Sequence, residues 1–236
     1  MSSTLLDEFL RCFSHCASCR RRGGGPLCRD CCHASVVGST AWRARIGAHP
    51  FYFVGHYRAE AGALTPLGRS LLAFKDYGDR YRGRQLATLF ARNLVDAARA
   101  CDLVVPVPSD LARLRQRGFA TATCLARVLA RVCRLPIASD ALRRVPGRPP
   151  QRGLDGGARR RNVLGAFEPT PAARATFDGR VVALCDDVMT TGATLASAAA
   201  CLVEAGASGV VCCVLACADD QTIADSAWQR RERRPG

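Results

Sequence analysis

Apolar residues in the C-terminal half of the chain follow a strand, helix, strand pattern. The segments 180–185, apolar after Arg180, and 209–216 are typical of strands buried on both faces of a sheet. Between them, a Thr/Gly turn leads into a helix that continues through Glu204 and ends at Ala205-Gly206-Ala207. This order predicts the βαβ unit of an open parallel sheet.

The preceding residues continue the alternation of strands and helices. Segment 51–57 has the aromatic and β-branched content of a strand, and 84–101 has apolar residues at helical spacing. Segment 102–109 is predicted to be a buried strand ended by prolines, with a second helix beginning after Gly118. The Gly- and Pro-containing stretch 146–161 is predicted to be a loop or a mobile arm. The predicted fold class is therefore α/β, an open parallel sheet flanked by helices.

Length and composition favour one globular domain with a small appendage. The chain has 236 residues, of which 48% are hydrophobic. The first part of the chain is rich in Cys, Gly and Arg and shows little periodicity, so something other than a hydrophobic core must hold it together. We predict a Cys-rich module at 1–45, an α/β domain at 46–220 and a basic tail at 221–236.

No apolar run approaches the roughly 20 residues that span a bilayer. The N-terminus, which contains Asp7, Glu8 and clustered cysteines, lacks the layout of a signal peptide. These observations predict a cytoplasmic protein with no membrane insertion.

The chain is strongly basic, with a formal net charge of +14, and Lys75 is its only lysine. Arginines are concentrated at 143–161 and 230–234. A basic surface attracts polyanions such as nucleic acid or pyrophosphate esters, although a solvated basic surface with no dedicated partner explains the charge equally well. The low aromatic content, 6%, argues against sequence-independent binding of single strands by base stacking.

Two C-x₂-C pairs lie close to the N-terminus. Cys16 and Cys19 form the first pair, and Cys28 and Cys31 form the second. Four thiolates suit tetrahedral Zn²⁺ in a closed, structural site, and metal binding would offset the missing core of so short a segment. Other potential ligands lie nearby, namely Cys12, His15, Cys32 and His33. An iron–sulfur cluster on the same four ligands and a set of free thiols are the alternatives.

The segment 186–194, Asp-Asp-Val-Met-Thr-Thr-Gly-Ala-Thr, follows the strand at 180–185. Open α/β sheets bind their ligands at this edge. Backbone N–H groups at the start of the following helix and the Thr190, Thr191 and Thr194 hydroxyls can surround a phosphate, and Gly192 permits close approach. The carboxylates of Asp186 and Asp187 can accept hydrogen bonds from vicinal sugar hydroxyls. In the alternative, the acids only cap the helix and the threonines are turn residues.

This order of residues resembles the phosphoribosyl pyrophosphate signature of type I phosphoribosyltransferases. Further landmarks resemble the ComF family, in which a four-cysteine zinc module commonly precedes the transferase-like domain: Pro106-Val-Pro108, Arg113-Leu-Arg-Gln-Arg-Gly-Phe119, Gln151, Leu154, Arg159-Arg-Arg-Asn162, Ala166-Phe167 and the Asp186 loop. Family members usually carry Asn-Gln after the Arg-Gly-Phe motif, whereas this chain has Ala120 and Thr121.

The resemblance implies roles for individual residues. Asp186 and Asp187 would bind the ribose hydroxyls and, as the catalytic residues, orient the ribose. The loop Thr190, Thr191, Gly192, Ala193 and Thr194 would hold the 5′-phosphate. A second loop would bind pyrophosphate together with Mg²⁺, and Pro108, Ser109 and Arg117 are its candidate residues, although a plain turn is equally consistent with Pro108 and Ser109.

Three functions are consistent with this resemblance. The first is transfer of a phosphoribosyl group to an unknown nitrogenous acceptor. The second is a non-enzymatic role in DNA uptake, through single-stranded DNA or a competence helicase. The third is a sensor that binds phosphoribosyl pyrophosphate without turnover.

Overall fold

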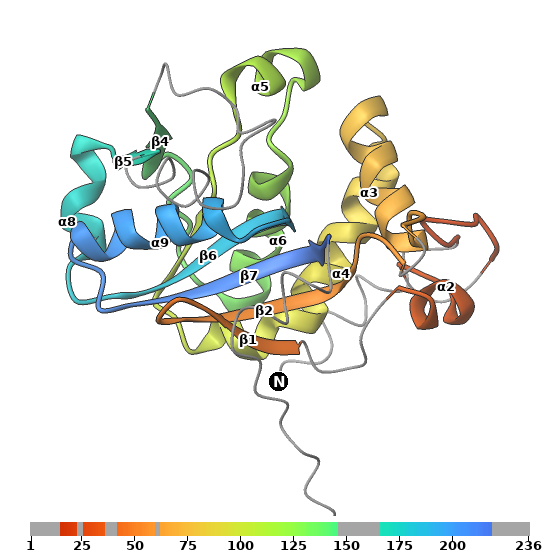
Figure 1. Cartoon of the computed structure of the whole chain (residues 1–236), viewed down its shortest axis with the longest axis horizontal. Helices are drawn as coiled ribbons and strands as arrows, with labels where there is room; N and C mark the ends of the chain where they lie inside the picture. The colour runs from red at the N-terminus through yellow and green to blue at the C-terminus, as the bar shows by residue number, and fades with distance from the viewer. Residues whose placement is uncertain (1–14, 23–25, 36–41, 60–61, 146–165, 219–236) are drawn as a thin grey trace, which may run out of the picture.

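A computed structural model describes residues 15–22, 26–35, 42–59, 62–145 and 166–218 (Figure 1). The predicted loop at 146–161, the predicted tail from 221 and Cys12 lie outside the described residues. So do the ComF-like landmarks between Gln151 and Asn162.

The core of the protein is a five-stranded sheet in the order β1-β2-β7-β6-β3. Its strands are β1 (Trp42–Ile46), β2 (His49–His56), β3 (Leu103–Pro106), β6 (Val181–Met189) and β7 (Gly209–Cys217). β1 pairs with β2 in antiparallel orientation, and all other pairs are parallel. The predicted open, mostly parallel sheet is confirmed.

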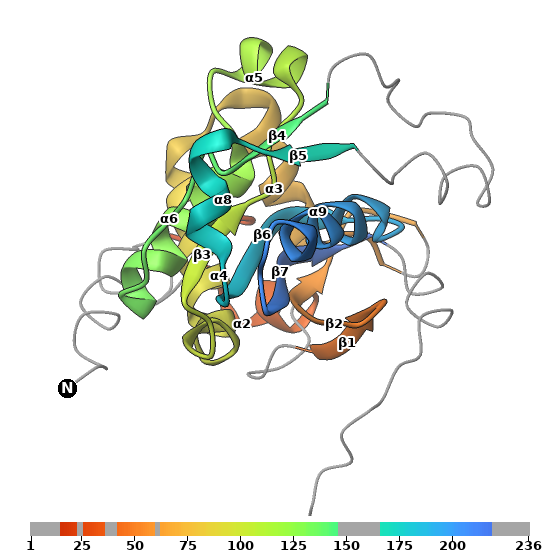
Figure 2. The same ribbon diagram turned by 90° about the vertical axis from the view of Figure 1, so that its left-hand side faces the viewer.

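Helices cover both faces of the sheet. One face carries α3 (Pro66–Tyr77), α4 (Arg80–Arg99) and α6 (Thr121–Cys133). The other face carries α8 (Arg174–Phe177), α9 (Ala193–Glu204) and the hairpin of β4 (Leu142–Arg144) and β5 (Phe167–Pro169). Figure 2 shows α9 and the α4–α6 pair on opposite sides of the sheet. Shorter helical segments are α2 (Arg29–His33), α5 (Leu111–Arg117) and a 3₁₀ turn at Pro171–Ala173.

Alternating side chains of the central strands supply two separate cores. In β6, Val182 and Leu184 pack toward α9, whereas Ala183 and Cys185 pack toward α4 and α6. Successive residues of a strand point to opposite faces, and each face here meets a layer of helices. This arrangement explains why the central strands are apolar without interruption.

Helix α3 was not predicted, although the sequence carries its boundary signals. Thr65 caps it by accepting a hydrogen bond from the Gly68 amide, and Pro66 occupies its first turn. Gly78 ends it in the left-handed conformation, with φ 63°. The following helix, α4, begins at Arg80, four residues before the predicted start at residue 84, because Asp79 caps it through the Arg82 amide.

Strand β6 is longer than predicted. The sequence indicated a strand over 180–185 with the acids in a following loop, but β6 continues to Met189, so Asp186 and Asp187 are strand residues. The reason lies in β7, which extends to Cys217 and pairs with β6 as far as Met189.

The Cys-rich segment is in direct contact with the sheet. The His56 amide donates a hydrogen bond of 2.9 Å to the Ser35 carbonyl, and Ser35 Oγ accepts one of 3.1 Å from the Leu67 amide. A Cβ atom on Gly55 would lie 2.1 Å from the Ser35 oxygen, so only glycine allows this approach. β1 spans residues 45 and 46, where a domain boundary was predicted, and the division into domains stays a prediction.

Among the helices of the described residues, none has both the length and the apolar character that a membrane crossing requires.

Candidate functional site

The carboxyl ends of β3 and β6 form the edge of the sheet at which the predicted site residues gather. β3 ends at Pro106, opposite Cys185, while β6 continues for four more residues beside β7. The helices that follow these strands, α6 and α9, lie on opposite faces of the sheet. Neighbouring parallel strands whose connections diverge in this way open a crevice between their carboxyl ends, where open α/β sheets bind ligands.

A small open pocket with about 190 Å³ of empty space lies at the end of β6. It is lined by Asp186, Val188, Met189, Thr190, Gly192, Thr194 and Leu195. Gly192 has φ 71° and precedes the first turn of α9, which has no side-chain cap. The pocket therefore combines a carboxylate, two threonines and a helix N-terminus, groups that can bind a phosphorylated sugar.

Other residues of the predicted loop lie beside the pocket and not in its lining. Thr191 is exposed in the turn, Ala193 is the first residue of α9, and Asp187 faces the other side of the sheet. The structure thus brings Asp186, Thr190, Gly192 and Thr194 together.

The two acids point to opposite faces because they are neighbours in a strand. Asp186 lines the pocket near α9. Asp187 turns toward α3, where Lys75 Nζ donates a hydrogen bond of 2.7 Å to its Oδ1. The Asp187 amide donates one of 2.8 Å to Asp186 Oδ1, which fixes the first carboxylate. Figure 1 shows α3 beyond the carboxyl ends of β6 and β7.

The Asp186 carboxyl has an unusual affinity for a proton. Burial, and next to it the charge of Asp187, raise its pKa to about 7. The hydrogen bond from the Asp187 amide and the charges of Lys75 and Arg144 act in the opposite direction. Perturbed carboxyl groups of this kind are common at functional sites, where burial and a like charge are combined.

Arg144 at the end of β4 belongs to the same crevice and was not singled out from the sequence. Its Nε donates a hydrogen bond of 2.9 Å to the Pro108 carbonyl, and its guanidinium lies 4.8 Å from the centre of the Phe167 ring. Partial burial lowers the pKa of Arg144, whereas the nearby carboxylates of Asp186 and Asp110 favour its charge. In the sequence, this residue could have been noticed because it belongs to the arginine-rich stretch that begins at Arg143.

The residues predicted to bind pyrophosphate occupy two places. Pro108 and Ser109 lie in the turn between β3 and α5, on the β3 side of the crevice. Arg117 at the end of α5 forms an ion pair of 3.5 Å with Asp76 of α3 and is not part of the pocket lining. Beside it, Phe119 stacks on Phe74 with ring centres 4.7 Å apart, which holds this segment against α3.

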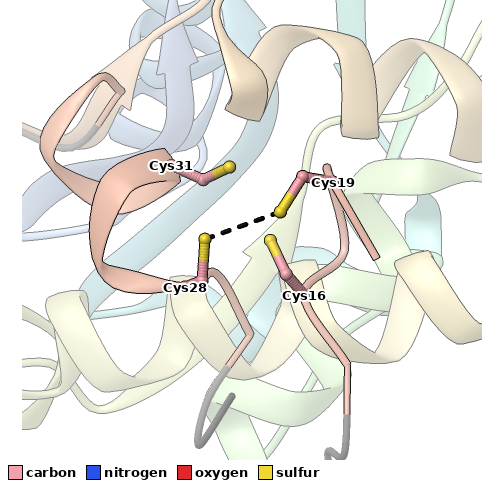
Figure 3. Close-up of side chains that lie close together, drawn as sticks. All are labelled: Cys16, Cys19, Cys28 and Cys31. Atoms are coloured by element: carbon pink, nitrogen blue, oxygen red, sulfur yellow. Dashed lines mark hydrogen bonds between the residues drawn. The ribbon is translucent and has the colours of Figure 1, made fainter. Parts of the chain in front are cut away.

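The four cysteines of the two C-x₂-C pairs come together, as Figure 3 shows. The sulfur atoms of Cys16, Cys19, Cys28 and Cys31 all lie within 4.8 Å of one another, and those of Cys19 and Cys28 are 3.6 Å apart. Four sulfurs at ~2.3 Å from a tetrahedral Zn²⁺ lie about 3.8 Å from each other. The cluster therefore fits a structural zinc ion, and the nearby His15, Cys32 and His33 are not part of it.

The surroundings of the sulfurs shift the pKa values of individual thiols in opposite directions. Burial opposes ionisation of Cys16, but backbone N–H groups of Cys28, Cys19 and Ser18 lower its pKa to about 7. Burial and the neighbouring thiols raise the pKa of Cys31 far above its usual value. Four thiolates at this distance repel one another, so a bound cation is needed to ionise them together.

The cluster is fixed to the N-terminal turns of α4. The Tyr81 hydroxyl donates a hydrogen bond of 2.8 Å to the His15 carbonyl and accepts one of 3.1 Å from the His15 amide. Arg82 Nε donates one of 2.8 Å to the Ala17 carbonyl, and Gln85 Nε2 also donates to the His15 carbonyl. An ion pair of 3.0 Å joins Arg20 to Asp79, the cap of α4.

Comparison with known proteins gives relatives of the chain. Competence protein F of Haemophilus influenzae is 34% identical over 147 residues, which are 60% of this chain and 61% of that protein. This chain is homologous to competence protein F. The predicted resemblance to the ComF family is confirmed at this level. The DNA utilization protein YhgH of Escherichia coli K12 is 33% identical over 109 residues, 46% of each chain.

The matches cover only part of each relative. The homologous region spans about 60% of competence protein F and about half of YhgH. No protein-family model matches the chain. A solved structure of the glutamine phosphoribosylpyrophosphate amidotransferase from B. subtilis, in complex with ADP and GMP, aligns with 54% of this chain and 24% of its own, at 19% identity and a TM-score of 0.36. The fold assignment therefore rests on the strand order of the sheet and not on the similarity to this solved structure.

Proposed function

We propose that this homologue of competence protein F binds phosphoribosyl pyrophosphate with Mg²⁺ at the end of β6. The observation that carries the proposal is the pocket itself. It joins a half-buried carboxylate of an adjacent acid pair to a Thr-Gly turn at the N-terminus of α9, at a switch point of the sheet.

Each part of the pocket has a counterpart in this ligand. The turn at Thr190–Thr194 and the start of α9 would hold the 5′-phosphate, because N–H groups, hydroxyls and the helix dipole all favour an anion. The carboxylates of Asp186 and Asp187 would accept hydrogen bonds from the ribose hydroxyls and so orient the sugar. Their charge would also stabilise positive charge that develops on the ribose.

The turn after β3 is the proposed place of the pyrophosphate. Pro108 and Ser109 lie in the turn after β3, and Arg144 Nε donates a hydrogen bond to the Pro108 carbonyl. A guanidinium can bind pyrophosphate oxygens through two hydrogen bonds. Arg117 would join it only if its ion pair with Asp76 opened. Mg²⁺ brought in with pyrophosphate would neutralise its charge.

The proposed reaction is transfer of the phosphoribosyl group to a nitrogenous acceptor. A sensor that binds the same ligand without turnover needs only the same pocket, so both functions share the first test.

Calorimetric titration of phosphoribosyl pyrophosphate with Mg²⁺ into the metal-loaded protein provides that test. We expect saturable binding that the double variant Asp186→Ala, Asp187→Ala loses by at least a factor of about 100, because two charged hydrogen-bond acceptors disappear. Asp140→Ala, which removes an exposed carboxylate away from the pocket, is the matched control. Absence of binding to the wild-type protein would refute the proposal.

A role in DNA uptake is the second candidate function, and the names of the relatives favour it. The net charge of +14 and the cysteine cluster suit contact with single-stranded DNA or with a helicase bound to it. Fluorescence anisotropy with a labelled oligonucleotide at increasing salt tests this candidate. Binding that weakens with salt and survives Asp186→Ala, Asp187→Ala would support a surface separate from the pocket.

We further propose that the cysteine cluster holds Zn²⁺ in a structural role. Four sulfur ligands leave no open coordination position, so the ion would stabilise the fold of residues 16–31 and take no part in a reaction.

A further inference from the structure

The one lysine of the chain lies at the candidate site. Of 34 basic residues, 33 are arginines, and the remaining one, Lys75, forms the ion pair with Asp187. Its ammonium group reaches the acid pair from α3.

The ion pair is shielded from solvent. Lys75 and Asp187 side chains are only 15% and 19% exposed, and their charged atoms are 2.7 Å apart. Shielding strengthens the attraction relative to an ion pair on the surface. Such a contact holds one Asp187 oxygen in place, while the lone pairs of the second oxygen stay available as acceptors.

The two acids receive their positive charges from different layers. Lys75 comes from α3 on one face of the sheet, and Arg144 comes from the β4–β5 hairpin on the other. Both cations favour the ionised form of Asp186, with Lys75 the stronger of the two. The other titratable groups within reach of the pair are Tyr57, Asp76, Arg117, Cys185 and Cys212.

We propose that Lys75 is a positioning residue of the site, which holds Asp187 in place as an acceptor for the hydroxyl groups of a sugar phosphate and supplies positive charge to the acid pair. This inference rests on the proposed function of the pocket. Lys75 acts through Asp187 and needs no contact with the ligand. Without its charge, the pKa of Asp186 would rise above its value of about 7, so the pair would keep a proton at pH values where the wild-type pair is ionised.

The test compares Lys75→Met with Arg69→Met, which removes an exposed cation of the same helix that donates a hydrogen bond to the Leu64 carbonyl. Carbon-13 NMR of the aspartate carboxyl groups follows the ionisation of Asp186, and calorimetry follows binding of phosphoribosyl pyrophosphate with Mg²⁺ at pH 7 and pH 9. We expect Lys75→Met to raise the titration midpoint of Asp186 by about one unit or more, because the charge of Lys75 favours the ionised form. Binding should weaken about fivefold or more at pH 7 and recover at pH 9, because the pair ionises there. Arg69→Met should change neither quantity.

Other outcomes overturn the inference or separate it from the proposed function. An unchanged Asp186 titration in Lys75→Met overturns it, as does equal weakening of binding at both pH values, which would mean direct contact with the ligand. If the wild-type protein does not bind the ligand, the proposed function fails, while the titration still decides whether Lys75 controls the acid pair. Should Lys75→Met unfold, Lys75→Arg keeps the charge and must keep the wild-type midpoint of Asp186.

Discussion

The cysteine cluster and the acid pair both hold like charges at close range, but they balance them differently. Around Cys16, the groups that favour the thiolate are backbone N–H groups of the cluster's own turns. Around Asp186 and Asp187, side-chain cations come from α3 and β4, elements remote in the sequence. Ionised together, the four thiols would need a bound metal ion to balance their charge, whereas the fold itself supplies counter-charges to the acid pair.

Removal of the metal should have the largest effect. Zinc-finger peptides gain about 10 kcal/mol or more from the ion, so Cys28→Ser should lose the metal and lower the free energy of unfolding by several kcal/mol. Metal analysis after dialysis and thermal melting with a chelator measure both effects. Cys124→Ser, a half-buried thiol of α6 outside the cluster, is the control. If the wild-type protein proved to be folded without bound metal, the cluster would not need an ion, and its contrast with the acid pair would be wrong.

Asp186→Asn should change the free energy of unfolding by a smaller amount, and this change should depend on pH. The pKa of Asp186 rises from 3.8 to about 7 in the folded protein, so folding favours the protonated form. This stabilisation is complete below about pH 4 and is lost as the pH rises through 7. Asn cannot ionise, so the variant should be more stable than the wild type above pH 7, by about 1–3 kcal/mol, and nearly equal at pH 4.

Urea unfolding at pH 4 and pH 8 measures this difference, with Asp140→Asn as the exposed control. A variant that is destabilised equally at both pH values would show that the Asp186 carboxylate contributes mainly through its hydrogen bond from the Asp187 amide.

The smallest effect should come from Arg144→Met. Its hydrogen bond to Pro108 and its contact with the Phe167 ring are partly exposed, so their loss should cost about 1 kcal/mol or less. The pKa of Asp186 should rise further, because a favourable charge disappears. Denaturant unfolding measures the change in stability, and carboxyl NMR measures the pKa of Asp186. A loss as large as that of Cys28→Ser would mean that Arg144 holds the β4–β5 hairpin in place.

Local sequence patterns were sufficient to predict some parts of the molecule. The C-x₂-C spacing indicated the four clustered cysteines, because each pair lies within one turn of the chain. The apolar runs indicated β6 and β7, and the acid-rich segment before the Thr-Gly turn indicated where a pocket lies.

The remaining parts depend on contacts between distant segments. Lys75 and Asp187 are 112 positions apart and meet only because α3 packs beside the ends of the central strands. Arg144 reaches Asp186 through a hairpin whose second strand begins at Phe167. The extension of β6 to Met189 depends on the length of its neighbour β7, which its own residues do not encode.

The opposite directions of Asp186 and Asp187 have a consequence for motion. A ligand held by both carboxylates would connect the two helical layers at one point, since each acid is paired with a cation from a different layer. Opening of either layer would then have to break the shared contact. Amide hydrogen exchange in α3 and in the β4–β5 hairpin should therefore slow together when the site is filled, although these elements lie on opposite sides of the sheet.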